Sequence, residues 1–384
     1  MDSRLDTVAV DAGSARFRRV LTVLSGARAT RLLVAITALG AVIAAPAVAQ
    51  AKKVTVYTGP PPKALAGLSK SFVAKYNPDV NAFFPDRLTI HVGDTVSFIR
   101  GMMPHTIDIP PVGKSDLPFF MTGGPVAGVN DAAGTPFWFN GHVPSLSINP
   151  QLLPAGPTTV NYDGTNRVES GFFLGRGAAP AFNVTFTKAG VFKVFCDVHY
   201  GMIGTVRVLP KAKPVPTAAQ DSAALRAQTL AAVNALKAAA TIKPPANSVS
   251  VGSAGPGGAE LFAMFPTTLR VKAGTVVTFS MSRDTRETHT VTFGSPLYLT
   301  KLIGGFLSDP LVTQQDLYPS ELPSGPAVVT PTVHGNGFAN LGALDRDSTT
   351  PLPASGKVMF PTPGTYHYAC LIHPFMRGTI IVTK

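Results

Sequence analysis

The sequence predicts an all-β protein in which two β-sandwich domains follow one another and are joined by a short α-helical linker. Glycine and proline are abundant, with 36 and 35 residues among 384. They separate short runs rich in β-branched residues, which is typical of sandwiches with long loops. A chain of this length is sufficient for two ordinary domains. The patterns of the first half recur in the second half, which indicates an internal duplication.

The N-terminal segment 1–49 has the features of an export signal. Several arginines, the last of them Arg31, precede an apolar run from Leu32 to Ala45. The run is followed by Ala47-Val48-Ala49, which matches a cleavage site with small residues. The alternative is an uncleaved membrane anchor, but the run is close to the minimum length that spans a bilayer. We therefore expect a cleaved signal peptide and a periplasmic or extracellular protein.

The two predicted domains, 50–210 and 246–384, share an early strand pattern. Apolar and polar residues alternate from Phe84 to Phe98 and again from Phe265 to Phe279, and each segment starts with Phe-Pro. Alternation of this kind is typical of strands with one buried face. The two segments align at a constant offset, which is the first sign of two copies of one domain.

Later in each copy, a glycine precedes a strand that ends in a cysteine. One face of this strand carries Phe192, Val194 and Cys196 in the first copy, and Tyr366, Tyr368 and Cys370 in the second. Successive side chains point to opposite faces of a strand, so we expect these side chains to face the core. Each cysteine would then lie at the end of a core strand, shielded from water.

The segment 211–245 differs in composition from both domains. The stretch from Thr217 to Thr241 is rich in alanine and is followed by Pro244-Pro245. Its larger apolar residues are predicted to share one helical face: they are Leu225, Leu230, Val233 and Leu236. We expect a single linker helix, packed on one domain or between the two, and the alternative is a mobile alanine-rich linker.

The main chemical signal is a Cys-x₂-His-x₂-Met pattern that occurs once in each copy. Its members are Cys196, His199 and Met202 in the first copy, and Cys370, His373 and Met376 in the second. Two imidazoles and a thiolate in a trigonal plane, with a weak axial thioether, form a blue-copper electron-transfer site. Each pattern would supply three of these four ligands. The cysteines, the only two in the chain, could instead form a disulfide in an oxidising compartment, but a disulfide does not explain the identical spacing.

The fourth ligand of each site must be a histidine from elsewhere in the chain. His105 and His289 follow the alternating strand at the same place in the two copies, so they are the candidates. Thr106 and Thr290 follow them and could hydrogen-bond to the cysteine loops and hold them in place. We expect no ligand role for the remaining histidines, which are His91, His142, His334 and His367.

These residues resemble the cupredoxin family, of plastocyanin, pseudoazurin and amicyanin type. The resemblance lies in the strand before the first histidine and in the cysteine loop of both halves, and is greatest from His373 to Gly378. It implies Greek-key β-sandwich domains with one type 1 copper each. By motif, the ligands would be His105, Cys196, His199 and Met202 in the first site, and His289, Cys370, His373 and Met376 in the second.

The resemblance further implies that the loop histidine of each site, His199 or His373, is partly exposed and passes electrons to partners. Neighbouring apolar residues would form a docking rim: Tyr200, Ile203, Pro374 and Phe375, together with Met102. The net charge of +12 favours redox protein partners with acidic surfaces. Basic runs interleaved with aromatic residues are missing from the sequence, so we expect no nucleic acid partner, and a membrane contact only through an uncleaved signal.

Three functions are compatible with two such sites. The first is an exported electron carrier, which is not an enzyme. The second is a copper oxidoreductase, similar to the nitrite reductases or multicopper oxidases that are also built from cupredoxin domains. Those enzymes need further histidine ligands, often in His-x-His pairs or directly before the cysteine, and here Phe195 and Ala369 occupy the latter position. The third is a copper-binding or delivery protein, which would have the same ligand set.

Overall fold

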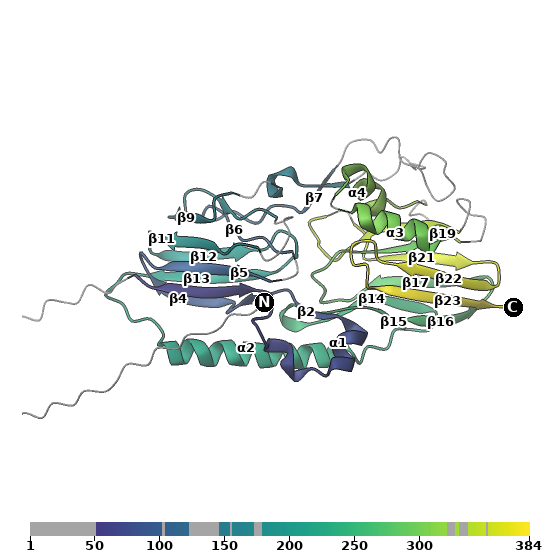
Figure 1. Cartoon of the computed structure of the whole chain (residues 1–384), viewed down its shortest axis with the longest axis horizontal. Helices are drawn as coiled ribbons and strands as arrows, with labels where there is room; N and C mark the ends of the chain where they lie inside the picture. The colour runs from purple at the N-terminus through teal and green to yellow at the C-terminus, as the bar shows by residue number, and fades with distance from the viewer. Residues whose placement is uncertain are drawn as a thin grey trace, which may run out of the picture. The chain divides into compact units, whose positions relative to one another are not determined.

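The computed structural model describes residues 51–101, 104–122, 146–153, 156–172, 179–306, 308–320, 327–329, 337–350 and 352–384. The predicted signal peptide, 1–49, lies outside these residues, as do His142 and His334. Residues Ala49–Lys384 form one compact unit. Strands dominate this unit and stack in layers (Figure 1), so the predicted all-β fold is confirmed. Among the described residues, no helix is long and apolar enough to cross a membrane.

The first β-sandwich consists of two five-stranded sheets. One sheet has the order β3-β1-β5-β11-β9, formed by Phe83–Phe84, Lys53–Thr58, Thr95–Arg100, Phe182–Phe186 and Thr159–Tyr162. The other has the order β10-β6-β12-β13-β4, formed by Val168–Glu169, Asp108–Ile109, Gly190–Phe195, Ile203–Leu209 and Arg87–His91. The inward side chains of both sheets form one apolar core, to which Phe98, Val184 and Phe192 belong. The alternation predicted for the segment from Phe84 to Phe98 is present, since Leu88, Ile90, Val96 and Phe98 are buried.

The second β-sandwich repeats this arrangement. One sheet has the order β19-β21-β17-β14-β15-β2, formed by Ala327–Val328, Ser355–Phe360, Thr275–Met281, Ser248–Gly255, Ala259–Phe265 and Pro78–Val80. The other has the order β16-β23-β22-β18-β20, formed by Thr268–Lys272, Arg377–Thr383, Gly364–Ala369, His289–Phe293 and Ala339–Leu344. Apart from β2, each strand has a counterpart at the same place in the first sandwich. For example, β4 pairs with β13 in parallel, and β16 pairs with β23 in parallel.

Strand β2 joins the first half of the chain to the sheet of the second. Its residues Pro78 to Val80 pair antiparallel with β15, and Val80 lies opposite Ala259. The backbone of the next residue, Asn81, donates to the carbonyl of Gly258 at 2.7 Å. The two halves are therefore connected by a continuous ladder of backbone hydrogen bonds as well as by the linker.

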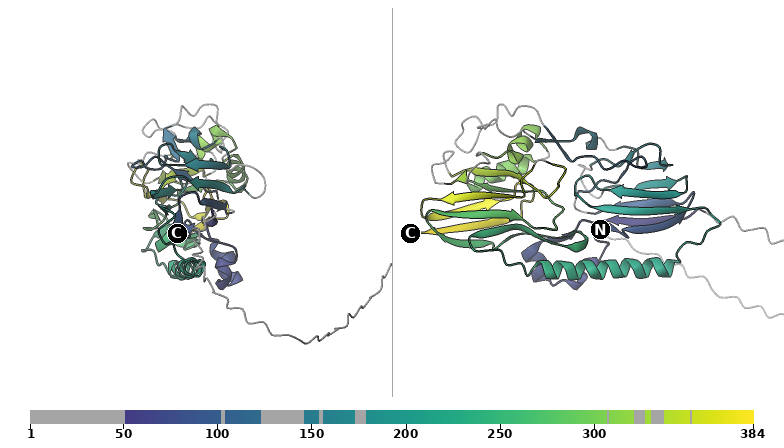
Figure 2. Two further views of the ribbon diagram at one scale, coloured as in Figure 1. Left: turned by 90° about the vertical axis from the view of Figure 1, so that its left-hand side faces the viewer. Right: turned by 180° about the vertical axis from the view of Figure 1, so that it is seen from behind.

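The linker contains the predicted helix, α2, from Ala218 to Ala239. Its N-terminus has a capping box, in which Thr217 and Gln220 bond reciprocally. Val233 and Leu236 pack into a third apolar core with residues of both halves, including residues of helix α1, Lys70–Tyr76. Seen from behind, helix α1 lies beside α2 (Figure 2). The helix therefore packs between the halves. Leu230, which was predicted to share a face with Val233 and Leu236, is 61% exposed, whereas the other buried residues of the helix are Ala232, Ala235 and Ala239.

The remaining elements lie in the long loops. They are the short helices η1, Ala64–Gly67, η2, Pro150–Leu152, and η3, Pro256–Gly258, and the two-stranded sheet of β7, Phe120–Thr122, and β8, Leu146–Ile148. In the second half, α3, Pro296–Gly305, and α4, Pro310–Leu317, complete the set. Leu299 and Leu302 of α3 pack against Leu371 and Phe338, so this helix covers the residue that follows Cys370.

Candidate metal centres

Both cysteine loops connect two paired antiparallel strands, and both have the same backbone fold. In the first loop, the amide of Cys196 donates to the carbonyl of Met202 at 3.1 Å, and the amide of Met202 donates to His199 at 2.9 Å. In the second loop, the corresponding bonds of Cys370 and Met376 measure 3.0 and 2.9 Å. The loop backbone thus fixes the three side chains of each pattern before any metal binds.

The first cluster forms where the loop meets His105, which precedes β6. The Sγ atom of Cys196 lies 3.6 Å from Nδ1 of His105 and 3.3 Å from Nδ1 of His199. All three side chains are buried, and their donor atoms lie within 4.8 Å of one another. The two predicted histidines therefore turn the same ring nitrogen toward the same sulfur.

The second cluster has the same composition and orientation. Sγ of Cys370 lies 3.8 Å from Nδ1 of His289 and 3.7 Å from Nδ1 of His373. The two imidazole Nδ1 atoms are 3.0 Å apart. His289 is the first residue of β18, just as His105 stands shortly before β6, so the two clusters are built from matching elements.

The two methionines of the patterns are buried beside their cysteines. Met202 belongs to the same apolar core as Cys196, and Met376 to the same core as Cys370. Both cysteines are free thiols, so the alternative disulfide is wrong. Bonds of about 2.0–2.3 Å to nitrogen and sulfur are usual for a first-row metal, and donor atoms that share such a metal lie roughly 3–4 Å apart. The observed donor set and spacing therefore fit one soft metal ion per cluster.

The predicted role of the two threonines is confirmed by their hydrogen bonds to the cysteine loops. Oγ1 of Thr106 accepts from the amide of Asp197 and donates to its carboxylate, both at 2.8 Å. Oγ1 of Thr290 accepts from the amide of Leu371 at 2.8 Å. The Thr290 amide also donates to the Cys370 sulfur at 3.4 Å. Each threonine therefore ties the strand of the first histidine to the loop of the cysteine.

The first histidine of each cluster lies against a glycine in the left-handed region. Gly59 has φ +87°, and a Cβ on it would lie 3.4 Å from Nε2 of His105. Gly252 has φ +78°, and a Cβ on it would lie 3.0 Å from Nε2 of His289. Only glycine adopts this conformation without strain and leaves room for the imidazole behind it.

The loop histidines are buried, which corrects an expectation from the resemblance. His199 is 1% exposed and His373 is 6% exposed, whereas a partly exposed ring was expected. Nε2 of His199 lies 3.2 Å from Oε1 of Glu287, and Nε2 of His373 lies 3.4 Å from Oε2 of the same residue. Glu287 was not found from the sequence, because it is a single acidic residue in a loop of the second half.

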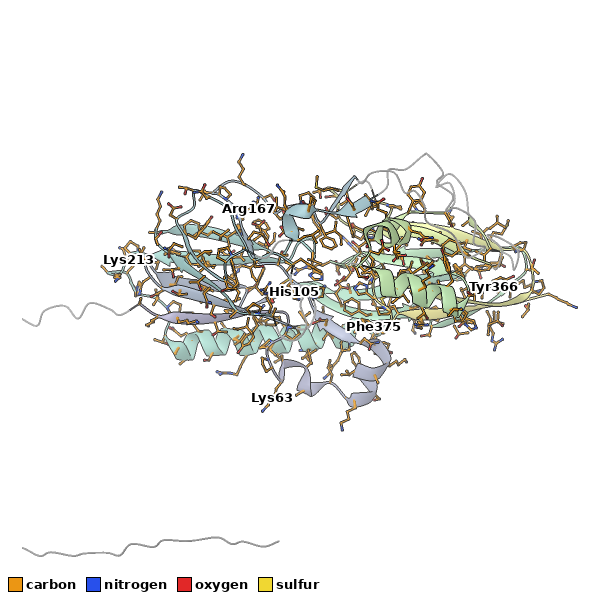
Figure 3. All side chains as sticks on the ribbon, turned by 45° about the horizontal axis from the view of Figure 1, so that its top comes forward. Lys63, His105, Arg167, Lys213, Tyr366 and Phe375 are labelled. Atoms are coloured by element: carbon orange, nitrogen blue, oxygen red, sulfur yellow. The ribbon has the colours of Figure 1, made fainter. Side chains whose placement is uncertain are left out.

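The predicted rim residues are exposed, although the histidines behind them are not. Tyr200, Ile203 and Phe375 have exposed side chains, as does Pro374. In Figure 3, His105 and Lys213 are labelled at opposite ends of the first sandwich, and Phe375 and Tyr366 at opposite ends of the second. The candidate metal centres therefore occupy the ends marked by His105 and Phe375. The predicted contribution of Met102 to the rim falls outside the described residues.

The ionisable groups of the clusters shift one another's pKa values. Burial raises the pKa of the Cys196 thiol, but the charge of His199 and hydrogen bonds to both imidazoles outweigh burial and hold this pKa well below its usual range. The Cys370 thiol pKa is lowered in the same way, against burial, by His289 and His373. The pKa of His373 is raised to about 9, because bonds to Cys370 and Glu287 outweigh its burial. The thiolate is the form that binds metals, so both sulfurs are prepared for that role.

The Glu287 carboxylate responds to the same charges. Burial raises its pKa, but the charge of His199 and the bonds to both loop histidines outweigh burial and hold the pKa well below its usual range. The pKa of His199 is in turn well above its usual range, since Glu287 and Cys196 outweigh the effect of its burial. Electrostatically, the two clusters therefore share this one acid.

A group of carboxylates beside the first cluster was also missed from the sequence. Asp108, Glu169 and Asp197 bring oxygens within 4.8 Å of one another, and Arg167 donates to Asp108. Burial, followed by repulsion within the group, raises the pKa of Asp108 to about 8 and that of Glu169 to about 11. Asp108 lies opposite Phe195, next to the cysteine, so these acids are neighbours of the metal centre.

Comparisons with known proteins gave structural similarities only. No protein-family model matches the chain, and no curated protein does. Among solved structures, amicyanin from Paracoccus versutus is 19% identical, covers 38% of this chain and 88% of its own, and has a TM-score of 0.21. Plastocyanin from Dryopteris crassirhizoma is 21% identical, covers 35% of this chain and 99% of its own, and has a TM-score of 0.19.

Proposed function

We propose that this chain is an exported copper-binding electron-transfer protein with one type 1 (blue) copper site in each of two tandem cupredoxin-like domains. One observation carries the proposal. In both halves, the cysteine and histidine of a Cys-x₂-His-x₂-Met loop converge on a further histidine to form a buried N, N, S donor set. Two imidazoles, a thiolate and a nearby thioether are the ligands of a blue-copper site.

The residues assigned to the metal are those predicted from the sequence. The first site would use His105, Cys196, His199 and Met202, and the second would use His289, Cys370, His373 and Met376. Copper bound by these residues would supply one-electron chemistry between Cu(I) and Cu(II). The loop backbone bonds and the threonine bonds described above keep the ligand geometry fixed, which favours rapid electron exchange because little has to rearrange. Burial of both cysteines shields the thiolates from water.

The assignment to two tandem copies is supported by the matching strand orders of the two sandwiches. It is further supported by the equal spacing of the ligands within each loop. We assign the copies to residues 50–210 and 246–384, with 211–245 as the linker.

Export and partners are part of the same proposal. The sequence of residues 1–49 supports a signal peptide, and therefore a periplasmic or extracellular location. The net charge of +12 supports acidic redox proteins as donor and acceptor. Mass spectrometry of the mature protein tests the first point, since cleavage predicts an N-terminus close to Gln50. Loss of electron exchange with partners at high salt tests the second.

One of the two alternative functions, a copper oxidoreductase, needs features that the described residues do not supply. A copper oxidoreductase requires additional histidine ligands. Of the histidines outside the two clusters, His91 bonds to the carbonyl of Lys213 and His367 to the hydroxyl of Thr379, so neither is near a further metal ligand set among the described residues. A copper-delivery protein would have the same ligands, and it is distinguished by experiment.

The decisive experiment measures copper per chain, the visible spectrum and the reversible potential of the copper-loaded mature protein. We expect two coppers, intense thiolate-to-copper absorption and reversible one-electron waves. One copper would mean that one cluster is purely structural. More than two coppers, weak colour, or rapid transfer of copper to an acceptor without redox change would contradict electron transfer as the function.

A further inference from the structure

The two loop histidines, one from each half of the chain, meet at a single carboxylate. Oε1 of Glu287 lies 3.2 Å from Nε2 of His199, and Oε2 lies 3.4 Å from Nε2 of His373. Each oxygen thus faces a different cluster. Glu287 is itself buried and stands two residues before His289 in the loop between β17 and β18.

The orientation of the two rings makes this contact a pair of hydrogen bonds. In both rings Nδ1 faces the cysteine sulfur, at 3.3 Å for His199 and 3.7 Å for His373. When Nδ1 of a neutral imidazole binds a metal, its only proton is on Nε2, and an ionised carboxylate can only accept. Both Nε2–H groups must therefore donate to Glu287, one to each oxygen.

The carboxylate is held in place by residues of both halves. Nδ2 of Asn81, which follows β2 in the first half, donates to Oε1 of Glu287. The guanidinium of Arg286 donates to the carbonyl of Asn81. Another buried acid, Glu260, holds the same loop by accepting from the amide of Arg286 at 2.7 Å and from the hydroxyl of Thr285 at 3.2 Å. Hydrogen bonds from residues of both halves therefore hold the Glu287 carboxylate and its loop in place.

This arrangement closes the outer edge of both loop histidines and connects them to each other. We propose that Glu287 is the bridge through which the two copper sites exchange an electron within one molecule. The inference rests on the proposed function, because it requires a copper in each cluster. In the exchange, one site is oxidised from Cu(I) to Cu(II) while the other is reduced from Cu(II) to Cu(I), and no bond forms or breaks.

The path consists only of residues of this chain. It runs through the ring of His199, a hydrogen bond, the carboxylate, a second hydrogen bond and the ring of His373. Since the carboxylate and both rings are buried and already bonded, no water or side chain has to move during transfer. Glu287 is a positioning residue as well, because it fixes the rotation of both rings through their outer nitrogens.

The test compares Glu287→Gln with a matched control, Asp284→Asn. Glutamine has the same shape, but its amide nitrogen donates and can no longer accept from one of the two imidazoles. The control neutralises an exposed acid that lies three residues earlier in the same loop and takes no part in the hydrogen bonds described above. In the fully oxidised protein, a pulse of reductant reduces part of the sites, and the redistribution of the electron between them is followed by absorption and by electron paramagnetic resonance.

We expect the internal rate to fall roughly 10- to 100-fold in Glu287→Gln, the range typical when a partner of a ligand histidine is removed, and to stay unchanged in the control. The zinc-loaded protein gives a second readout that needs no electron transfer. Proton resonance of the wild-type protein should show two slowly exchanging Nε2–H signals, and Glu287→Gln should lose one. If Glu287→Gln fails to fold, Glu287→Asp, whose shorter side chain cannot reach both rings, takes its place.

An unchanged internal rate in Glu287→Gln, with both coppers bound, would overturn the proposed bridge while leaving the two copper sites in place. Two Nε2–H signals that exchange rapidly in the wild-type zinc protein would overturn it as well. The copper content and colour of the wild-type protein are measured first. Failure of the proposed function is thus separated from failure of the bridge.

Discussion

The two candidate copper sites have the same ligands but different neighbours. The residue after the cysteine is Asp197 in the first site and Leu371 in the second. The strand position opposite the cysteine strand is Asp108 in the first half and Thr292 in the second. The first site thus has carboxyl groups where the second has an apolar residue and a hydroxyl.

Aromatic packing increases this difference. The ring of Phe262 lies against both imidazoles of the second site, with centroids 4.8 Å from His373 and 6.0 Å from His289. The hydroxyl of Thr292 donates to Asn340 at 2.8 Å, so the polar group there is satisfied without charge. The comparison indicates that the Cys-x₂-His-x₂-Met loop, present in both halves, sets which donor atoms converge in each cluster, while residues that differ between the halves set the surroundings of the cluster.

The largest expected effect comes from removing one thiolate at a time. Cys196→Ser and Cys370→Ser should each lose one copper of two and about half of the visible absorption, because the hydroxyl is a poor ligand for a soft metal. Copper analysis and absorption spectra of the two variants check this. A variant that retains both coppers, or loses both, would break the picture of two independent ligand sets.

The next effect tests a buried carboxyl group near Cys370 of the second site. Asp316 is fully buried, and neither of its carboxyl oxygens has a hydrogen-bond partner among the described residues. Burial, followed by the charge of Cys370, raises its pKa to about 9. A raised carboxyl pKa means that the folded protein holds a proton that the unfolded chain releases near pH 4. Stability is therefore full below that pH and is lost as the pH rises toward 9, by up to about 1.4 kcal/mol per pH unit.

Asp316→Asn should remove this loss. We expect the free energy of unfolding of the variant to equal that of the wild type near pH 4 and to exceed it increasingly up to pH 9. Denaturant unfolding of both proteins across this range measures the difference. Parallel pH profiles would show that Asp316 is ionised or paired in the folded protein.

A smaller effect is expected at the glycines behind the first histidines. Gly252→Ala should cost more stability than Gly59→Ala, because the added Cβ lies 3.0 Å from His289 in the second half and 3.4 Å from His105 in the first. Positive φ alone costs roughly 1–2 kcal/mol for alanine. Matched controls are Gly274→Ala and Gly93→Ala, which have positive φ but no atom within 4 Å of the added Cβ.

Unfolding free energies of the four variants separate backbone strain from contact with the imidazole. The two controls should show the strain alone, and Gly252→Ala should exceed Gly274→Ala. Equal losses in all four would mean that the glycines are needed only for backbone conformation.

Much of the fold and of the ligand clusters could be predicted from the sequence, because the same residue patterns occur in both halves of the chain. The spacing of Cys196, His199 and Met202 recurs in the second half, and the place of His105 in the repeat is that of His289. A local pattern and its repeat are sufficient when the residues come from one loop and one strand. The burial of Tyr366 and Tyr368 followed from strand alternation for the same reason.

Features that depend on contacts between the two halves, or that occur in one half alone, could not be found this way. Glu287 matters because β2 and the linker helix bring the halves together, and no local pattern marks that contact. The one available signal was a departure from the repeat, since the residue two before the first histidine is Glu287 in one copy and Met103 in the other. Helix α3 was missed although Ser295 and Pro296 form a usual helix start.

The smallest expected effect is the difference in reduction potential between the two sites. The potential of a blue-copper site depends on the hydrophobicity and hydrogen bonding around the cysteine sulfur. At the first site, the ionised form of Asp197 favours the more highly charged Cu(II), whereas Asp108 and Glu169, with pKa values raised to about 8 and about 11, stay neutral at pH 7. Near the second site, Phe262 and Leu371 favour Cu(I). The second site should therefore have the higher potential, which would direct electrons from the first site to the second.

Voltammetry of Cys370→Ser and Cys196→Ser measures each site alone. In the Cys370→Ser background, Asp197→Asn should raise the potential on the order of tens of millivolts, whereas Asp163→Asn, which changes an exposed acid of the same half, should leave it unchanged. A first site with the higher potential, or one indifferent to Asp197, would mean that ligand geometry rather than the neighbouring carboxylates distinguishes the two coppers.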